Sequence, residues 1–337
     1  MGLTHFPHGI FATPNIGGSR IFEVWNSNNI FFVDGDGGMS INDGLSPESA
    51  VTKPSEAIAL AQSRGPVIYV KPRTTSASAQ TYYTDDIVIP LTLPNTSIIG
   101  AGFQGCTNSF SGVQIGPTTV GGHLIDVLGA GANIENMRLT LRSGTADAAK
   151  SIIHAVATTS QTAKPSGLTV RYCRFSSDKS HPGYTSTDAI ACIGLGSASQ
   201  VIIEGNVFYD VLGGISYQNT SGTANDIQIT GNKFCGPVAD RDCDILLNIS
   251  DSSGVMIVNN VFSDGKPAHS GGSFTKFVYL AGGTTGVMAG NYFSTGTENS
   301  IADSTGTDCV IPTTFFCPCN WYEGVTNTAP YGIVTAT

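Results

Sequence analysis

A short pattern of apolar and polar residues recurs along the middle of the chain. Each unit has an apolar residue, two variable residues, an asparagine, any residue and a phenylalanine, as in Ile-Glu-Gly-Asn-Val-Phe from Ile203 onward. Units begin at Ile134, Val170, Ile203, Ile229, Ile257 and Met288. The two earliest units have methionine and cysteine in the asparagine slot. Successive slots lie 26 to 36 residues apart, a period that is typical of solenoids.

The arrangement of residues within each unit distinguishes between the kinds of solenoid. Helical repeats of this length need apolar residues at helical spacing, whereas these units alternate over short runs separated by Gly, Ser and Asn. A propeller blade needs four strands in about 40 residues. Each unit here shows two or three short strands. We therefore predict an all-β fold, a right-handed parallel β-helix in which each unit is one coil.

Stacking of coils accounts for the recurring asparagines and phenylalanines. Adjacent coils lie about 4.8 Å apart, so the same slot in successive coils forms a column of like side chains. A side-chain amide both donates and accepts hydrogen bonds, whereas stacked carboxylates repel one another. The predicted columns are Asn206, Asn232, Asn260 and Asn291, and, in the core, Phe175, Phe208, Phe234, Phe262 and Phe293. Both columns are structural, and their asparagines are not expected to be ligands.

The segments that flank the repeat predict caps for the two ends of the solenoid. A short helix capped by Thr52, with Pro54 in its first turn and one apolar face across Glu56–Arg64, would cover the first coil, and a strand follows it at Val67–Val70. The chain then divides into an N-terminal arm with the first strand (1–45), the β-helix (46–296) and a C-terminal segment (297–337). The last segment is rich in aromatic residues and proline, and it is either an irregular cap or a contact between subunits.

Two stretches of the sequence resemble known proteins. Phe31–Asp34, Asn42–Ala50 and Val67–Val70 together resemble the opening of pectate-lyase-like β-helix proteins, over roughly residues 29–295. That fold hosts lyases, hydrolases, tailspikes and inert structural proteins, so the resemblance implies the fold and no particular activity. Met1–Gly9 is similar to the start of uncharacterised structural proteins of tailed bacteriophages, which implies a virion component. Related phage β-helices are commonly trimers, so a homotrimer is implied as well.

Composition restricts the partners of the chain. Charged residues make up 12% of it, against about 25% in globular proteins, and the formal net charge is −9. An acidic chain repels a phosphate backbone, which argues against nucleic acid as a partner. The first residues lack the pattern of a signal peptide, and no apolar run reaches about 18 residues. We therefore expect synthesis in the host cytoplasm, no membrane partner and, from the motifs, no cofactor.

One acidic segment is the best candidate for catalysis. On a strand, Asp240, Asp242 and Asp244 would point to one face, and clustered carboxylates can supply the acid and the base of glycoside hydrolysis. The further carboxylates that neighbouring coils can add to this set are Asp188, Asp210 and Asp226. Aspartate is also favoured in turns, and Gly236-Pro237 nearby indicates a turn. A solvated turn and a carbohydrate-cleaving site both remain open.

Other patterns that suggest chemistry are better explained by turns. Asp34, Asp36 and Asp43 lie in a glycine-rich loop whose spacing fails that of an EF-hand, so the loop is a solvated turn or an irregular calcium site. Gly100–Gly105 matches a dinucleotide-binding glycine pattern, but turn-like residues follow it, which predicts a coil corner. The six histidines show no spacing typical of metal ligands.

Three functions are compatible with this scaffold. The favoured one is a non-enzymatic virion protein, a trimeric capsid decoration or cement protein or a short fibre, which would bind copies of itself and other virion proteins such as the major capsid protein. The second is a tailspike-type polysaccharide depolymerase with Asp240–Asp244 in its groove. The third is a glycan-binding adhesin that holds host surface glycans on exposed tyrosines such as Tyr82, Tyr83 and Tyr184.

Overall fold

The computed structural model describes the strands of the repeat and many of the turns between them. The residues described are 29–62, 65–73, 83–102, 112–116, 123–141, 151–156, 165–177, 191–196, 198–209, 211, 213–217, 224–235, 243–247, 252–263, 276–280, 282–294, 309–312 and 314–323. All statements about the structure below refer to these residues.

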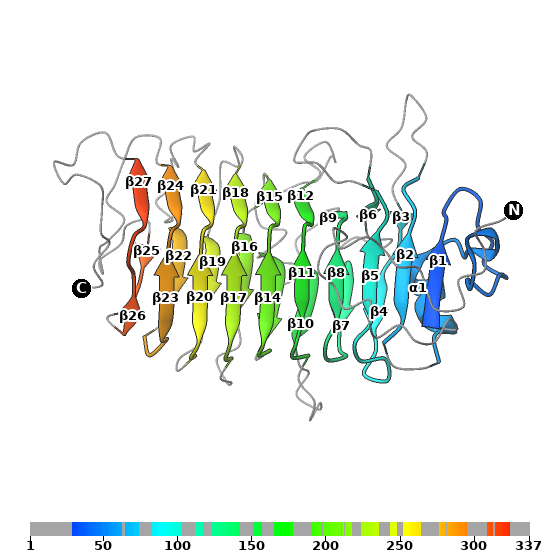
Figure 1. The fold of residues 1–337 in the computed structure, drawn as a ribbon, viewed down its shortest axis with the longest axis horizontal. Coiled ribbons are helices and arrows are strands. Elements are labelled where there is room, and N and C mark those ends of the chain that lie inside the picture. The colour runs from blue at the N-terminus through cyan, green and yellow to red at the C-terminus, as the bar shows by residue number, and fades with distance from the viewer. Residues whose placement is uncertain are drawn as a thin grey trace, which may run out of the picture.

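Three parallel sheets run the length of the molecule (Figure 1), and in the described residues they have ten, nine and eight strands. In spatial order, the first sheet contains β1 (Ile30–Val33), β2 (Val67–Val70), β5 (Ser97–Gly100), β8 (Asn133–Glu135), β11 (Thr169–Arg171), β14 (Val201–Glu204), β17 (Ile227–Thr230), β20 (Val255–Val258), β23 (Gly286–Ala289) and β26 (Phe315–Phe316). The second contains β3 (Tyr83–Thr84), β6 (Gln114–Gly116), β9 (Arg138–Leu141), β12 (Arg174–Ser177), β15 (Val207–Tyr209), β18 (Lys233–Cys235), β21 (Val261–Ser263), β24 (Tyr292–Ser294) and β27 (Trp321–Glu323). The third contains β4 (Ile87–Ile89), β7 (Ile125–Val127), β10 (Ser151–Val156), β13 (Ala191–Gly196), β16 (Gly213–Tyr217), β19 (Cys243–Leu247), β22 (Lys276–Leu280) and β25 (Cys309–Val310).

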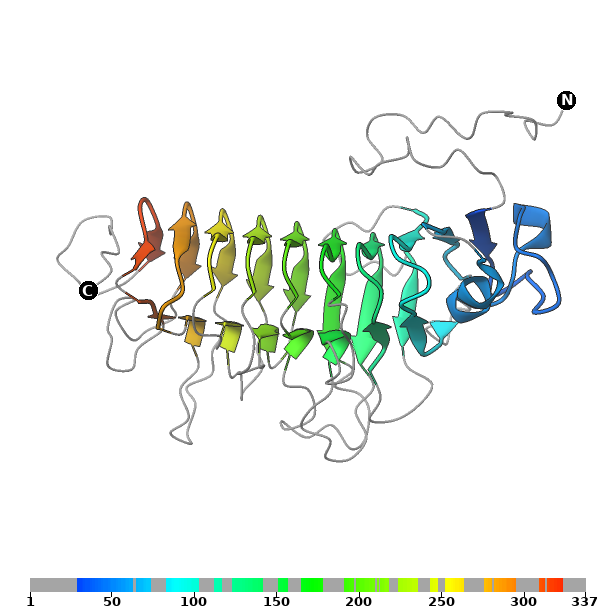
Figure 2. The same cartoon turned by 90° about the horizontal axis from the view of Figure 1, so that it is seen from below.

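The order in which the chain passes through these sheets is that of a solenoid. From β2 onward, consecutive strands join the first, second and third sheet in turn, and each strand pairs in parallel with the strand three places later. Figure 2 shows the coils as successive rungs of one stack. Helical structure in the described residues is limited to α1 (Pro54–Leu60) and a 3₁₀ turn at Pro47–Ser49. The predicted all-β parallel solenoid is thereby confirmed.

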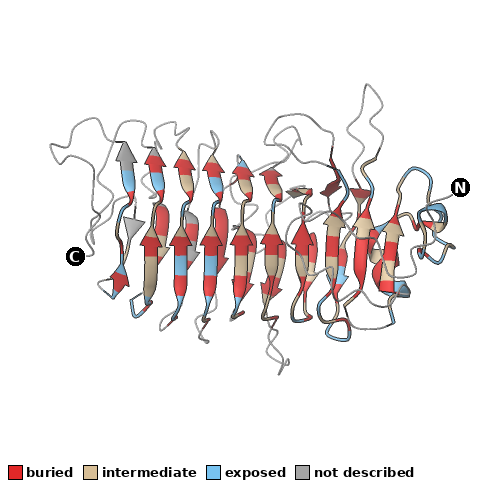
Figure 3. Ribbon diagram, viewed as in Figure 1, coloured by how far each residue is buried: buried red, intermediate tan, exposed pale blue. Residues whose placement is uncertain are grey.

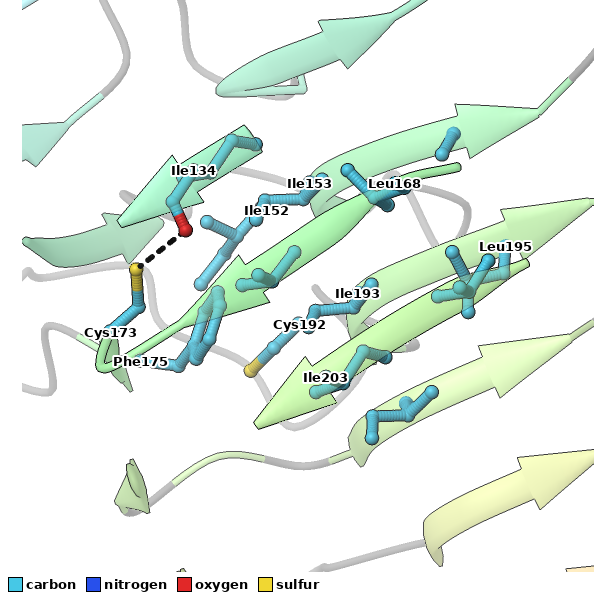
Figure 4. Packing of buried hydrophobic residues seen from close by; sticks show 14 of the residues in the cluster. Ile134, Ile152, Ile153, Leu168, Cys173, Phe175, Cys192, Ile193, Leu195 and Ile203 are labelled. Carbon is cyan, nitrogen blue, oxygen red and sulfur yellow. Dashed lines mark hydrogen bonds between the residues drawn. The ribbon is translucent and has the colours of Figure 1, made fainter. Parts of the chain in front are cut away.

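Side chains alternate between the core and the surface along the strands (Figure 3), as expected for a pleated strand with one buried face. In β14, Val201 and Ile203 are buried, while Ile202 and Glu204 are partly exposed. Apolar side chains from all three sheets meet in one continuous core. Figure 4 shows part of it, where Cys173 in the asparagine slot donates its thiol hydrogen to the Ile134 carbonyl oxygen, with an S···O distance of 3.7 Å.

The repeated asparagines form one column of buried amides. The Nδ2 group of Asn232 donates to the Ile203 carbonyl of the preceding coil at 2.8 Å and to Asn260 Oδ1 of the next coil at 3.0 Å. Its own Oδ1 accepts from the backbone N–H and the Nδ2 group of Asn206, at 2.9 and 3.0 Å. The same contacts recur at Asn260 and Asn291. Each amide thus satisfies two donors and two acceptors that would otherwise be buried without partners.

The repeated phenylalanines form a second column beside the amides. Rings at Phe175, Phe208, Phe234, Phe262 and Phe293 stack in sequence, with centroids 4.6 to 4.9 Å apart and interplanar angles of 3 to 7°. All five side chains are fully buried. The spacing of the rings equals the separation of neighbouring strands, about 4.8 Å, so ring stacking and backbone pairing support the same register.

A left-handed turn precedes every slot of the amide column. The residue before the slot has a φ between 52 and 66° in each described coil from Asn136 to Cys319. Glycine adopts this conformation at little cost, and asparagine tolerates it better than most residues. Gly205, Gly231, Gly290, Asn136 and Asn259 follow this preference. In the Gly-Asn and Asn-Asn pairs of the repeat, the first residue therefore adopts the left-handed turn and the second forms the hydrogen bonds of the amide column.

The solenoid continues beyond the boundary that the sequence indicated at residue 296. Strands β25, β26 and β27 pair with β22, β23 and β24, and so add a further coil to the three sheets. Asn320 extends the amide column, because its Oδ1 accepts from the backbone N–H and the Nδ2 group of Asn291, at 3.1 and 2.9 Å. Strands of the stack therefore occur as far as Glu323, within the segment that the sequence analysis assigned to a cap or a contact between subunits.

The N-terminal helix is shorter than predicted and begins differently. It spans Pro54–Leu60, with Lys53 at the N-cap position. Thr52 lies outside the cap and donates, from its backbone and its hydroxyl, to Glu56 Oε2 at 2.8 and 2.7 Å. Ala57 and Ile58 are buried in the core. None of the described helices is long and apolar enough to cross a membrane.

Candidate functional site

Most of the predicted acidic site lies outside the described residues. Asp240 and Asp242 lie outside the described residues, as do Asp188 and Asp210. Asp244 belongs to β19 of the third sheet, whereas Asp226 lies directly before β17 of the first sheet. Asp226 and Asp244 therefore lie at different sheets in their backbone positions, and the acidic cluster stays a prediction from the sequence.

The glycine-rich loop near the N-terminus uses its carboxylates internally. Asp34 accepts from the backbone N–H groups of Asp36 and Gly37, at 3.0 and 3.1 Å, and pairs with Lys71 Nζ at 2.6 Å. Burial raises the pKa of Asp34, but these hydrogen bonds and the Lys71 charge outweigh it, so its pKa lies below the usual value. Asp43 accepts from the Ser49 hydroxyl at 2.6 Å. These contacts support the solvated turn over a calcium site.

Within the described residues, no group of three or more His, Cys, Asp or Glu side chains is arranged to hold a metal ion.

Tyr83 is not the exposed platform that the adhesin hypothesis assumed. It is buried, accepts from the Gly35 N–H at 3.0 Å and donates to the Lys71 carbonyl oxygen at 2.5 Å. Burial, the largest effect, raises its pKa to about 12, so the hydroxyl keeps its proton. Tyr83 therefore ties the N-terminal loop to the first coil. Tyr82 and Tyr184 lie outside the described residues.

Two histidines that the sequence did not connect meet on the third sheet. The rings of His123 and His154 stack with centroids 3.8 Å apart and an interplanar angle of 5°. Nδ1 of His154 lies 2.9 Å from Asp126 Oδ1, and Nδ1 of His123 accepts from the Ser151 N–H at 3.0 Å. Asp126 and His154 are direct register partners of β7 and β10. Aligning Ile125 with Ile153 in the sequence would have predicted this contact.

The histidine pair and Asp126 form a partly exposed polar cluster. The Asp126 carboxylate at Nδ1 orients the His154 imidazole and directs Nε2 away from itself. The side chains of His154 and Asp126 are about a quarter and a third exposed, so solvent reaches both. Stacked rings direct their nitrogen lone pairs in parallel, which does not suit a metal ion shared by the two imidazoles. The arrangement places a carboxylate and two imidazoles side by side at the surface.

The outer face of the second sheet gathers aromatic and cationic side chains. Arg138 and Arg174 are register partners on β9 and β12, and the Arg174 guanidinium lies 5.0 Å from the centroid of the Tyr209 ring. Nearer the C-terminus, Tyr292 and Trp321 are register partners, and the Trp321 side chain is 55% exposed. Aromatic faces attract C–H groups and cations, and arginines attract carboxylates. This face is therefore suited to an acidic or sugar-rich ligand.

The comparisons with known proteins add no assignment. No family model matches the chain, and no curated protein or solved structure is significantly similar to it.

Proposed function

We propose that the chain is a right-handed parallel β-helix that serves as a non-enzymatic structural component of a tailed-bacteriophage particle. In this role it is made in the host cytoplasm and assembles as a homotrimer on the virion, as a capsid decoration or cement protein or a short fibre. Its partners are then copies of itself and other virion proteins, such as the major capsid protein.

The observation that carries the proposal is the unbroken stack of coils with its two buried columns. Amides from Asn206 to Asn320 and phenyl rings from Phe175 to Phe293 link successive coils without interruption. Such a core resists local opening, because no coil can leave without stranding buried polar groups of its neighbours. A rigid scaffold of this kind suits a load-bearing particle component, and the similarity of Met1–Gly9 to phage structural proteins points the same way.

Two finer features of the fold belong to the proposal. Right-handed coiling is supported by the parallel connections between strands of the same sheet, because such crossovers are almost always right-handed. A cap formed by α1 is supported by the burial of Ala57 and Ile58 against the first coils. An uncovered first strand would otherwise invite pairing with another chain.

Copy number in purified particles tests the structural role. We expect the chain to be present in particles of the virus that encodes it, in hundreds of copies for a decoration protein or a few to a few dozen for a tail part. Gel densitometry against the major capsid protein in the same lane measures the ratio. Particles that are complete and infectious but lack the chain would contradict the proposal.

Glycan binding is a second candidate, favoured by the aromatic and cationic face of the second sheet. We expect Trp321→Ala and Tyr292→Ala to reduce retention on immobilised host capsule or lipopolysaccharide by about tenfold each, through lost stacking. Val88→Ala, an exposed position on the third sheet, is the control and should leave retention unchanged.

The same assay distinguishes binding from cleavage. Release of new reducing ends that disappears in Asp242→Ala would establish the depolymerase alternative instead. Unchanged retention in both aromatic variants would exclude this face as the binding surface.

A further inference from the structure

Charged residues are distributed unevenly over the outer face of the first sheet. On its middle strands, Arg171 and Glu204 point outward and pair at 2.9 Å. The strands that follow, β17, β20, β23 and β26, contain no Asp, Glu, Lys or Arg. These four consecutive strands carry no charged side chain, although the chain as a whole carries a net charge of −9, and the exposed Asp226 lies directly before β17 at the edge of this face.

The side chains on this face form two parallel rows set by the register of the sheet. One row runs Gln228, Met256, Val287 and Phe316, which are partners in neighbouring strands. The other runs through Thr230, Val258 and Ala289. Met256 is 39% exposed and Phe316 is 68% exposed. We call these seven residues the neutral face.

The composition of the neutral face matches the centre of a protein interface. Such centres are depleted in charged residues and enriched in methionine and aromatic residues. Met256 and Phe316 are exposed and Val287 between them is half-buried, so their apolar side chains are contiguous. A contiguous apolar surface indicates an interaction surface, whereas scattered exposed residues need no explanation.

The charge of the chain identifies the partner. Two copies of an acidic protein repel one another wherever charged surfaces meet, and the repulsion grows as the surfaces approach. The neutral face allows two copies to approach without bringing unpaired carboxylates together. We infer that copies of this chain associate with one another through the neutral face of the first sheet, near the C-terminal end of the solenoid. The inference rests on the proposed function, a self-assembling structural protein, and adds which face the copies share.

The test places a carboxylate on the neutral face and an identical charge elsewhere. Met256→Glu and Phe316→Glu each add one negative charge to the face, and Val88→Glu adds one to an exposed outward position on the third sheet. Sedimentation of the full chain over a concentration series measures association, and far-UV circular dichroism verifies folding. Phe316 is the more exposed of the two positions, so its variant keeps the test valid if Met256→Glu fails to fold.

We expect the wild-type chain and Val88→Glu to associate alike, and both neutral-face variants to associate at least about tenfold more weakly. Two results overturn the inference alone: neutral-face variants that associate as the wild type does, or Val88→Glu weakened to the same extent. A wild-type chain that stays monomeric at all concentrations overturns both the inference and the trimer. Absence from purified particles, measured separately, overturns the virion role and leaves the neutral-face result standing.

Discussion

Replacing Asn232 with leucine should lower the free energy of unfolding by about 3–5 kcal/mol, since each buried polar group left without a partner costs about 1–3 kcal/mol. Asn232 accepts two hydrogen bonds from Asn206 and donates one each to Ile203 and Asn260. Leucine has a similar volume and makes none of these bonds, so the Asn206 N–H loses its hydrogen-bond acceptor and the Ile203 carbonyl loses its donor. Denaturant unfolding measures the loss, or the unfolding rate at fixed denaturant if refolding is incomplete.

Two further variants separate hydrogen bonding from a general effect of mutation. Asn225→Leu changes a half-buried asparagine outside the column whose Oδ1 accepts from Ser253, and it should cost less than about 1 kcal/mol. Asn232→Asp places a carboxylate against the Ile203 carbonyl, where burial should raise its folded-state pKa above the unfolded value. The stability of that variant should therefore rise as the pH falls through the raised pKa. Equal losses in Asn232→Leu and Asn225→Leu would show that the amide column contributes nothing special.

Replacing Phe234 with alanine should lower the free energy of unfolding by about 3–5 kcal/mol, the usual range for a buried phenylalanine. Its ring is fully buried between Phe208 and Phe262, with centroids 4.6 and 4.9 Å away. Truncation removes both stacking contacts and leaves a cavity that cannot close, because the coils on either side are held apart by their backbone pairing. The same unfolding measurement applies.

Trp321→Ala is the matched control for Phe234→Ala. Trp321 lies on the same sheet but faces outward and is 55% exposed. Its loss should cost less than about 1 kcal/mol, because little apolar area returns to water. A loss below about 1 kcal/mol for Phe234→Ala would mean that the core collapses around the missing ring and that the aromatic column does not maintain the spacing of the coils.

Where sequence and structure agree, the information is local and repeated. The slots at Asn206, Asn232, Asn260 and Asn291 were recognisable because an apolar residue three places before each slot and a phenylalanine two residues after it recur at short range. Stacking at a constant spacing then places equivalent residues in one column whatever the loops between them do. Asn320 was missed because proline and cysteines replace the apolar residues and glycine of the pattern there.

The sequence failed to predict contacts between residues that do not occupy equivalent positions in successive repeat units. Tyr83 looked like a surface residue, but it is buried, and its hydroxyl contacts Gly35 in the loop after β1 and Lys71 directly after β2. His123 and His154 lie on different coils, and their meeting depends on the register between β7 and β10. Loops of unequal length separate these strands, so residue spacing did not reveal the register.

The sequence by itself determined the architecture and the identity of the two core columns, because a period-two alternation and a recurring Asn-x-Phe slot leave a stacked coil as the arrangement that buries them. The tertiary structure alone decided which surface residues become neighbours, including the stacked histidines, the aromatic and cationic face, and the neutral face. The physical reason is that core positions repeat along the chain, whereas each surface row is assembled from residues about thirty positions apart, brought side by side by the register of the sheets.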